Sequence, residues 1–153
     1  MTKPKFDIWQ FQMQLSGRLM RWAGFSIGTG IALVVTGDRV ANANKFNQGV
    51  GSQFIGWGVI DGLLAFFGAQ YASRKTAELE VHTQARQDKA RRNLRTLLSV
   101  NTGLDVLYVL GGLWLARHKG KDKAFWRGSG WGIVGQGAFL FIFDLIHALY
   151  LRK

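Results

Sequence analysis

Three aspartates interrupt otherwise apolar stretches of this chain, and they are the residues best suited to carry chemistry. They are Asp61, Asp105 and Asp144. On insertion scales, an aspartate at the centre of a membrane-spanning helix costs roughly 2.5 to 3.5 kcal/mol, so three lipid-facing aspartates would be strongly unfavourable. We therefore expect all three to face the interior of a helical bundle, each protonated or hydrogen-bonded to a polar neighbour.

Other polar side chains follow the helical period around these aspartates. Asn101, Asp105 and Tyr108 stand at steps of four and three residues, which places them on one side of a helix. Asp144 lies on one side of the last apolar stretch, with Gln136 near the edge of that side. The predicted intramembrane polar core comprises Asp61, Asn101, Asp105, Tyr108, Gln136 and Asp144.

Two interpretations of this polar core remain open. Hydrogen-bonded Asp and Asn side chains could act as structural glue that fixes helix register, at about 0.6 kcal/mol per bond. Intramembrane carboxylates also mark relays in transporters, so a path for ions, protons or small solutes is the alternative. The aspartates do not coincide when the two halves of the chain are overlaid, which speaks against a transporter built on a duplicated site.

His147 is the one histidine inside an apolar stretch, because His82 and His118 fall in the predicted connections. A self-contained haem site with two histidine ligands needs a second facing imidazole, so His147 is only a possible ligand contact. The chain has no cysteine, which excludes thiolate metal sites. The few serines have no plausible His and Asp partners nearby. We expect no catalytic residues, no enzymatic activity, no metal and no cofactor.

Four apolar stretches position these side chains. Each is about as long as the roughly 20 residues needed to cross the hydrocarbon core of a bilayer, and charge is nearly absent inside them. The sequence predicts an all-α fold, a four-helix transmembrane bundle in a single membrane domain covering 1–153. The predicted spans are 17–37, 50–72, 94–116 and 129–151.

The predicted bundle consists of two tandem helical hairpins. The first covers 17–72, with a polar loop at 38–53, and the second covers 94–151. A charged cytoplasmic helical linker at 73–93 joins them, with its turn near His82 and Thr83. Residues 1–16 mix aromatic side chains with glutamines, which suits an interfacial segment with Trp9 at headgroup depth. An aromatic tail packed on the bundle is the alternative.

An internal repeat supports the two-hairpin architecture. A shift of 79 residues overlays identical residues of the two halves without a gap. Two independently glycine-rich hairpins are the alternative explanation. The overlaid pairs are Leu15 and Leu94, Leu19 and Leu98, Gly24 and Gly103, Phe46 and Phe125, Gly49 and Gly128, Gly51 and Gly130, Gly56 and Gly135, Gly58 and Gly137, and Tyr71 and Tyr150.

Glycines are frequent in the apolar stretches, where small residues let helix backbones approach closely. Some of them stand four residues apart, as Gly24 and Gly28 do, and so share one face of a helix. The glycines predicted to pack helices are Gly24, Gly28, Gly49, Gly56, Gly112, Gly128, Gly135 and Gly137.

The net charge of +11 is explained by basic residues that flank the spans. Thirteen of the 20 Lys and Arg residues lie on the side of the two tails and the linker, when Arg18 and Arg21 at the mouth of the first span are included. The positive-inside rule therefore places both termini and the linker in the cytoplasm. No recognition helix or metal finger accompanies the charge, so we expect the lipid bilayer and not nucleic acid as partner.

The second half of the chain resembles an uncharacterised family of small bacterial four-helix membrane proteins, known only as a domain of unknown function. The resemblance implies a multi-pass protein of the bacterial inner membrane and supplies no activity. We expect a non-catalytic scaffold or accessory subunit that binds other integral membrane subunits or itself; the alternative is a small channel or proton-coupled carrier that uses the aspartates. The resemblance is carried by Asn101, Gly103, Leu104, Asp105, Tyr108, Gly111 and Gly112, and by Gly135–Gly137, Phe139 and Asp144.

Overall fold

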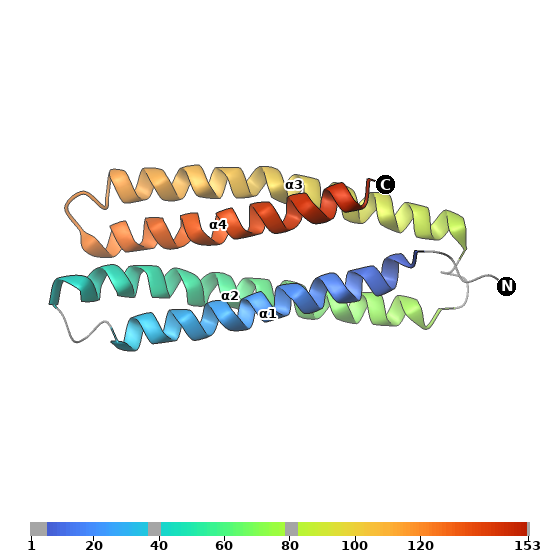
Figure 1. The fold of residues 1–153 in the computed structure, drawn as a ribbon, viewed down its shortest axis with the longest axis horizontal. Coiled ribbons are helices and arrows are strands. Elements are labelled where there is room, and N and C mark those ends of the chain that lie inside the picture. Colours follow the sequence, from blue (N-terminus) through green and yellow to red (C-terminus); the bar gives the residue numbers. More distant parts are fainter. Residues whose placement is uncertain (1–5, 37–40, 79–82, 153) are drawn as a thin grey trace.

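The computed structural model describes residues 6–36, 41–78 and 83–152 of the chain. Within these residues the regular structure is entirely helical, in four long helices (Figure 1). They are α1 (Ile8–Thr36), α2 (Ala41–Thr76), α3 (Gln84–Arg117) and α4 (Ala124–Tyr150). All four are long and apolar enough to cross a membrane. The predicted all-α class with four membrane-length helices is confirmed.

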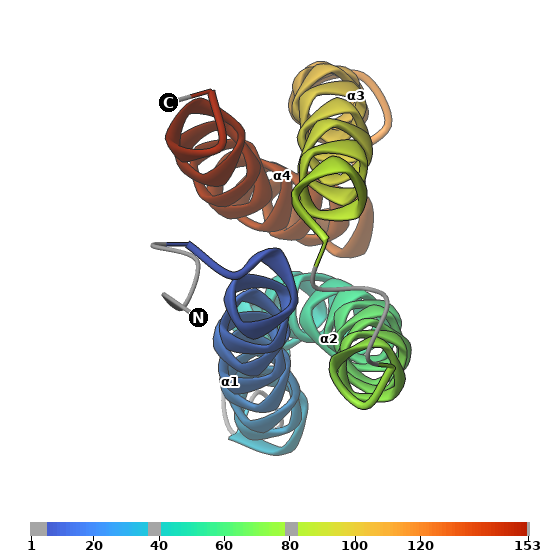
Figure 2. The same cartoon turned by 90° about the vertical axis from the view of Figure 1, so that its right-hand side faces the viewer.

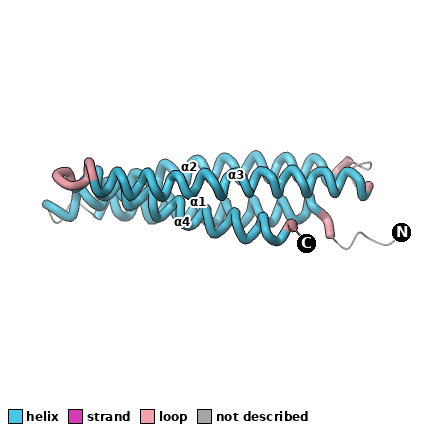
Figure 3. The backbone as a smooth tube through the Cα atoms, turned by 90° about the horizontal axis from the view of Figure 1, so that it is seen from above, coloured by secondary structure: helices cyan, strands magenta, loops and turns pink. Residues whose placement is uncertain are grey.

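The helices run up and down the long axis, so α1 begins and α4 ends at the same end of the molecule (Figure 1). Helix α1 packs along α2, α3 packs along α4, and α2 packs against α4 (Figures 1 and 2). Among the described residues, no Cα atom of α2 lies within 8 Å of one in α3. The same holds for α1 and α4, so the helices of both these pairs lie farther apart than those of the pairs α1–α2, α3–α4 and α2–α4. Figure 3 shows α2 and α3 from above.

The helices are longer than the apolar stretches that predict them. The sequence predicts a polar loop at 38–53, but α2 already begins at Ala41. This part of the helix is stabilised by packing, because Phe46 and Gly49 lie against the first turns of α4. At the other end of the hairpin α2 runs to Thr76. The predicted turn of the linker at His82 lies outside the described residues.

The first turns of α1 are part of the bundle, which differs from the predicted interfacial segment 1–16. Helix α1 runs without a break from Ile8, and Ile8 and Trp9 are buried. The backbone N–H of Ile8 donates to the side-chain oxygen of Gln87 on α3 at 2.9 Å, and the Phe11 ring stacks on Tyr150 of α4. Burial within the bundle accounts for the apolar surface of these side chains, although the Trp9 indole N–H has no hydrogen-bond partner among the described residues. Residues 1–5 of the predicted segment lie outside the described residues.

Glycines allow the closest helix contacts in the molecule. At the crossing of α2 and α4, a Cβ atom on Gly49 would overlap the carbonyl oxygen of Phe125, and one on Gly128 would overlap that of Phe46. Gly112 makes the corresponding kind of contact between α3 and α4, where a Cβ atom would lie 2.7 Å from the carbonyl oxygen of Gly130. Small residues at these positions let the backbones touch.

The remaining predicted packing glycines divide into two groups. A Cβ atom on Gly137 would approach Val109 of α3 to 3.1 Å, so this glycine also serves packing. Gly24, Gly28 and Gly56 face open space, because a Cβ atom added at any of them would have no neighbouring atom within 4 Å, and Gly135 has only ordinary contacts with Phe54. Gly24, Gly28 and Gly56 therefore do not bring helices together within the chain, whereas Gly135 lies on the side of α4 that contacts Phe54 of α2.

The α2–α4 crossing gives a prediction about stability. Gly49→Ala places a methyl group against the backbone of α4, and overpacking of this kind typically costs about 1–3 kcal/mol. We expect a clear fall in the free energy of unfolding of the detergent-solubilised protein, measured by thermal or denaturant unfolding. Gly56→Ala on the same helix adds the same methyl into open space and is the matched control. Equal stability of the two variants would contradict this description of the crossing.

Candidate functional site

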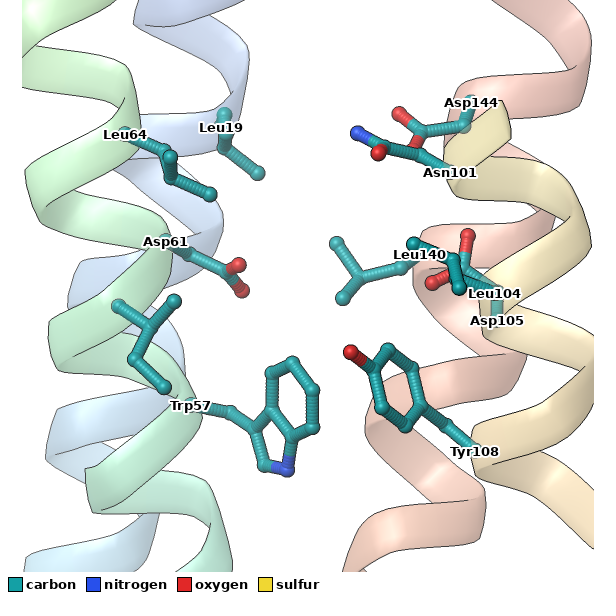
Figure 4. A pocket seen from close by; sticks show the side chains of 11 residues that line it. Leu19, Trp57, Asp61, Leu64, Asn101, Leu104, Asp105, Tyr108, Leu140 and Asp144 are labelled. Atoms are coloured by element: carbon teal, nitrogen blue, oxygen red, sulfur yellow. The ribbon is translucent and has the colours of Figure 1, made fainter. Parts of the chain in front are cut away.

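A cavity of about 170 Å³ lies between the two halves of the bundle, near the middle of the helices (Figure 4). Helices α1 and α2 form one wall and α3 and α4 form the other. It contains five of the six residues of the predicted polar core. The lining residues are Leu19, Trp57, Ile60, Asp61, Leu64, Asn101, Leu104, Asp105, Tyr108, Leu140 and Asp144.

All three intramembrane aspartates point toward this cavity. Asp61 comes from α2, Asp105 from α3 and Asp144 from α4, and their exposed fractions are 2%, 3% and 7%. Among the described residues, the Oδ2 atoms of Asp61 and Asp105 are buried and have no hydrogen-bond partner. A buried carboxylate without a partner is strongly unfavourable as an anion, so these groups must hold a proton or face a cation.

Asn101 has a different role from the carboxyl groups. Its side chain lies beside Asp144 in Figure 4, and its amide group is the neighbouring hydrogen-bond donor of that carboxyl group. The helical spacing in the sequence predicts interhelical bonds of this kind. The polar core therefore combines one aspartate that has a neighbouring donor with two that each keep an unpartnered oxygen.

Two aromatic rings close one end of the cavity. The rings of Trp57 and Tyr108 meet edge to face, with centroids 4.8 Å apart. Trp57 stands four residues before Asp61 on α2, and Tyr108 stands three residues after Asp105 on α3. Since residues three or four apart share one face of a helix, each facing helix presents one ring and one carboxyl group to the cavity.

The cavity is bounded by exposed apolar side chains on the side between α2 and α3. Leu64 of α2 is 59% exposed and Leu104 of α3 is 42% exposed, although both line the cavity. The backbones of these two helices do not meet here. The side chains of Leu64 and Leu104 therefore form part of both the cavity lining and the outer surface of the bundle.

Gln136 lies outside this site, which corrects its placement in a single polar core. It is fully buried on the opposite side of the bundle, between α4 and α1. Its side-chain oxygen accepts a hydrogen bond from the Trp22 indole N–H at 3.0 Å, and its side-chain nitrogen donates to Ser26 Oγ at 3.0 Å. Trp22 also stacks on Phe139, with ring centroids 3.5 Å apart. This network closes the α1–α4 side.

His147 does not line the cavity, and both of its ring nitrogens are engaged. Nδ1 lies 2.6 Å from the carbonyl oxygen of Phe143, which can only accept, so Nδ1 carries the proton. Nε2 then accepts a hydrogen bond from the Arg18 guanidinium at 3.0 Å. A ligand on His147 would have to displace Arg18. The geometry therefore supports a packing role and gives no support to the predicted ligand contact.

The site is not built as a metal centre. In the part of the chain that the structure describes, no group of three His, Cys, Asp or Glu side chains is arranged to hold a metal ion. The carboxyl groups come from three different helices, and leucines separate them in the lining. The arrangement can exchange protons or neutralise a cation larger than a bare metal ion.

Sequence reasoning missed the apolar part of the lining and the partners of Gln136. Leu64 and Leu104 have the composition of any lipid-facing position, and no sequence signal distinguishes them. Trp22 is missed because an indole counts as apolar, although its N–H must find a partner when buried. That rule, applied to every tryptophan in a span, is the signal that could have found it.

Comparison with protein-family models identifies the family of the chain. The model of a family of unknown function, DUF6992, matches residues 18–145 of the chain. The matched segment includes every residue that lines the cavity. The resemblance to a family of unknown function is thus confirmed over most of the chain. Neither the curated proteins nor the solved structures contain a significant match.

The α1–α4 network leads to a second prediction about stability. Gln136→Leu leaves the Trp22 N–H and the Ser26 hydroxyl without their partner. Interhelical hydrogen bonds in membranes contribute about 0.6 kcal/mol each, so we expect a loss of about 1 kcal/mol in the free energy of unfolding. Gln14→Leu, at an exposed position of α1, is the control. An unchanged stability of the Gln136 variant would mean that the network does not hold α1 to α4.

Proposed function

The chain belongs to the DUF6992 family of unknown function, and we propose that it is a small proton-coupled carrier whose cavity carboxyl groups bind and release a proton or cation. One observation carries this proposal. Asp61 and Asp105 are almost fully buried, face the same cavity from the two halves of the bundle, and each keeps a carboxyl oxygen without a partner. Such groups are placed to exchange a charge within the membrane.

The competing interpretation of these aspartates as structural glue receives less support. In a purely structural role, each carboxyl group would accept hydrogen bonds across a helix interface. Asp144 has a neighbouring donor in Asn101, but the Oδ2 atoms of Asp61 and Asp105 have none among the described residues. Removing an unpartnered acceptor does not weaken a helix contact. The two aspartates are therefore better explained by a ligand than by packing.

The proposed architecture is a pair of tandem hairpins that repeat one unit. The crossing of α2 and α4 supports it, because an offset of 79 residues converts the Phe46–Gly128 contact into the Phe125–Gly49 contact. Two equivalent hairpins that meet at such a crossing can rock against each other. A rocking motion of this kind would change the access of the cavity between them.

The proposal also includes the location of the protein. We place it in a bacterial inner membrane as a multi-pass protein, with both termini and the charged linker 73–93 in the cytoplasm. The excess of Lys and Arg in the tails and linker supports this orientation. The Asp105 carboxyl group would then lie near the middle of its span, within reach of neither aqueous phase without a movement of the helices.

A second candidate function is a scaffold or accessory subunit, which the outward-facing glycines favour. Gly24 and Gly28 share the open face of α1, and Gly56 lies on an open face of α2. Small residues on a lipid-facing surface let another helix approach closely. Such a partner would be another integral membrane subunit or a second copy of this chain.

The carrier proposal predicts flux that depends on the cavity aspartates. We expect the wild-type protein in liposomes to dissipate a pH gradient, followed with a trapped pH-sensitive dye. Asp61→Asn and Asp105→Asn remove the titratable group and keep its shape, so each should reduce the flux at least about tenfold. Asp122→Asn, in the exposed turn between α3 and α4, is the matched control. Full flux in both cavity variants would contradict the proposal, provided that all variants show wild-type thermal stability.

The scaffold candidate predicts a stable assembly. If it holds, the protein extracted in mild detergent should migrate and weigh, in native mass spectrometry, as a homo-oligomer or with larger subunits. Gly24→Leu together with Gly28→Leu should then dissolve the assembly, because both side chains would stand between the helices. A wild-type protein that is monomeric under these conditions would contradict this second function.

A further inference from the structure

We infer that the ligand of the cavity is a small organic cation with an aromatic or apolar body, such as an arylalkylamine or a quaternary ammonium, which enters from the bilayer between α2 and α3. The inference deepens the proposed function and rests on the same carboxyl groups. It names the class of molecule that the lining recognises and the route by which it arrives.

The charge of the lining selects a cation. Three carboxyl groups face the cavity, and its eleven lining residues include no Lys, Arg or His. The titratable groups around it are Asp61 from α2, Asp105 and Tyr108 from α3, and Asp144 from α4, whereas α1 contributes only Leu19. An anion would meet repulsion from three helices. A neutral molecule without hydrogen-bond donors would leave the two unpartnered carboxyl oxygens unpaired.

The aromatic rings select an organic cation over a hydrated metal ion. Trp57 and Tyr108 stand about one turn or less from Asp61 and Asp105, so a cation between the two helices would meet a ring and a carboxyl group from each side. Ring faces attract ammonium groups, most of all where water is excluded. A hydrated metal ion would instead have its water shell in contact with leucines.

The size of the cavity limits the molecule to about one ring. Pockets for drug-sized ligands usually begin near 300 Å³, and this cavity measures about 170 Å³. Leucine and isoleucine side chains form much of the remaining lining, among them Leu19, Leu104 and Leu140. They provide apolar contacts for the body of the molecule, while the ammonium group lies among the carboxyl groups.

The two sides of the bundle differ in a way that defines the route. On the α1–α4 side, Trp22, Ser26 and Gln136 form the buried network described above. Among the described residues no Cα atoms approach within 8 Å across either side, but on the α2–α3 side Leu64 and Leu104 are both exposed and part of the lining. An amphipathic cation partitions into the bilayer, so it reaches this opening without passing through either aqueous end of the bundle.

The test uses benzyltrimethylammonium, a permanent cation with one ring. We expect saturable binding to the full-length protein in phosphatidylcholine nanodiscs, measured by calorimetry. Asp61→Asn and Asp105→Asn should weaken binding at least about tenfold, because each removes a charge that a buried cation faces. Tyr108→Leu should weaken it about two- to fivefold through the lost ring contact. Asp122→Asn should bind as the wild type does.

Two further comparisons test the ligand's charge and its route of entry. The first replaces the cation by a neutral molecule of the same shape, and the second blocks the opening between α2 and α3. The neutral isostere neopentylbenzene should compete poorly, because it leaves the carboxyl groups unpaired. Leu104→Trp at the lateral opening should slow association of the cation, whatever its effect on affinity, because the larger ring narrows the opening. Leu107→Trp, on the lipid-facing side of the same helix, should not slow association.

The outcomes separate this inference from the proposed function. Absent cation binding, unchanged binding in both aspartate variants, or equal binding of the neutral isostere would overturn the ligand class, while aspartate-dependent proton flux would still support the carrier. Binding that follows the charges without any flux would support the ligand class and contradict the carrier. An unchanged association rate in the Leu104 variant would overturn the lateral route alone.

Discussion

The close contact of α2 with α4 through Gly49 and Gly128 is the constraint on which the rest of the molecule depends. Both helices touch backbone to backbone over their first turns, and the two then separate toward the end where α4 finishes (Figure 1). The separation leaves room in the middle of the bundle. One side of this space is closed by the bonds of Gln136, and the other keeps the cavity with its carboxyl groups. A bulkier residue at the crossing would alter both sides at once.

The sequence is sufficient to predict the helices and the inward direction of the aspartates. A lipid-facing aspartate is too unfavourable to be tolerated, so Asp61, Asp105 and Asp144 could only point inward, and they do. The sequence does not predict which polar residues share one site. Gln136 stands eight residues before Asp144, which is about 80° around the helix, and the sequence does not show that this offset is enough to turn it toward Trp22 of α1.

The sequence also does not show which glycines contact a neighbouring helix. Gly24, Gly28 and Gly49 are indistinguishable in sequence, yet only Gly49 touches a neighbouring helix. Which face of a glycine-rich helix is inside depends on the larger side chains around it. For α1 the choice is set by Ser26 and Gly30, which are buried, and by the aromatic turns at its beginning. Those turns also explain why residues 8–16 join the bundle instead of lying in the headgroups.

The first turns of α1 have a consequence for how the protein is made. Ile8 and Trp9 belong to a cluster that also contains Leu94, Leu98 and Leu151, and Ile8 is bonded to Gln87. A ribosome delivers the beginning of α1 to the membrane long before these partners exist. The first turns of α1 therefore lack these partners until α3 and α4 have been inserted. The bundle is closed only when α4 is complete. In a chain truncated before α4, the apolar side chains at the start of α1 would lack their partners Tyr150 and Leu151.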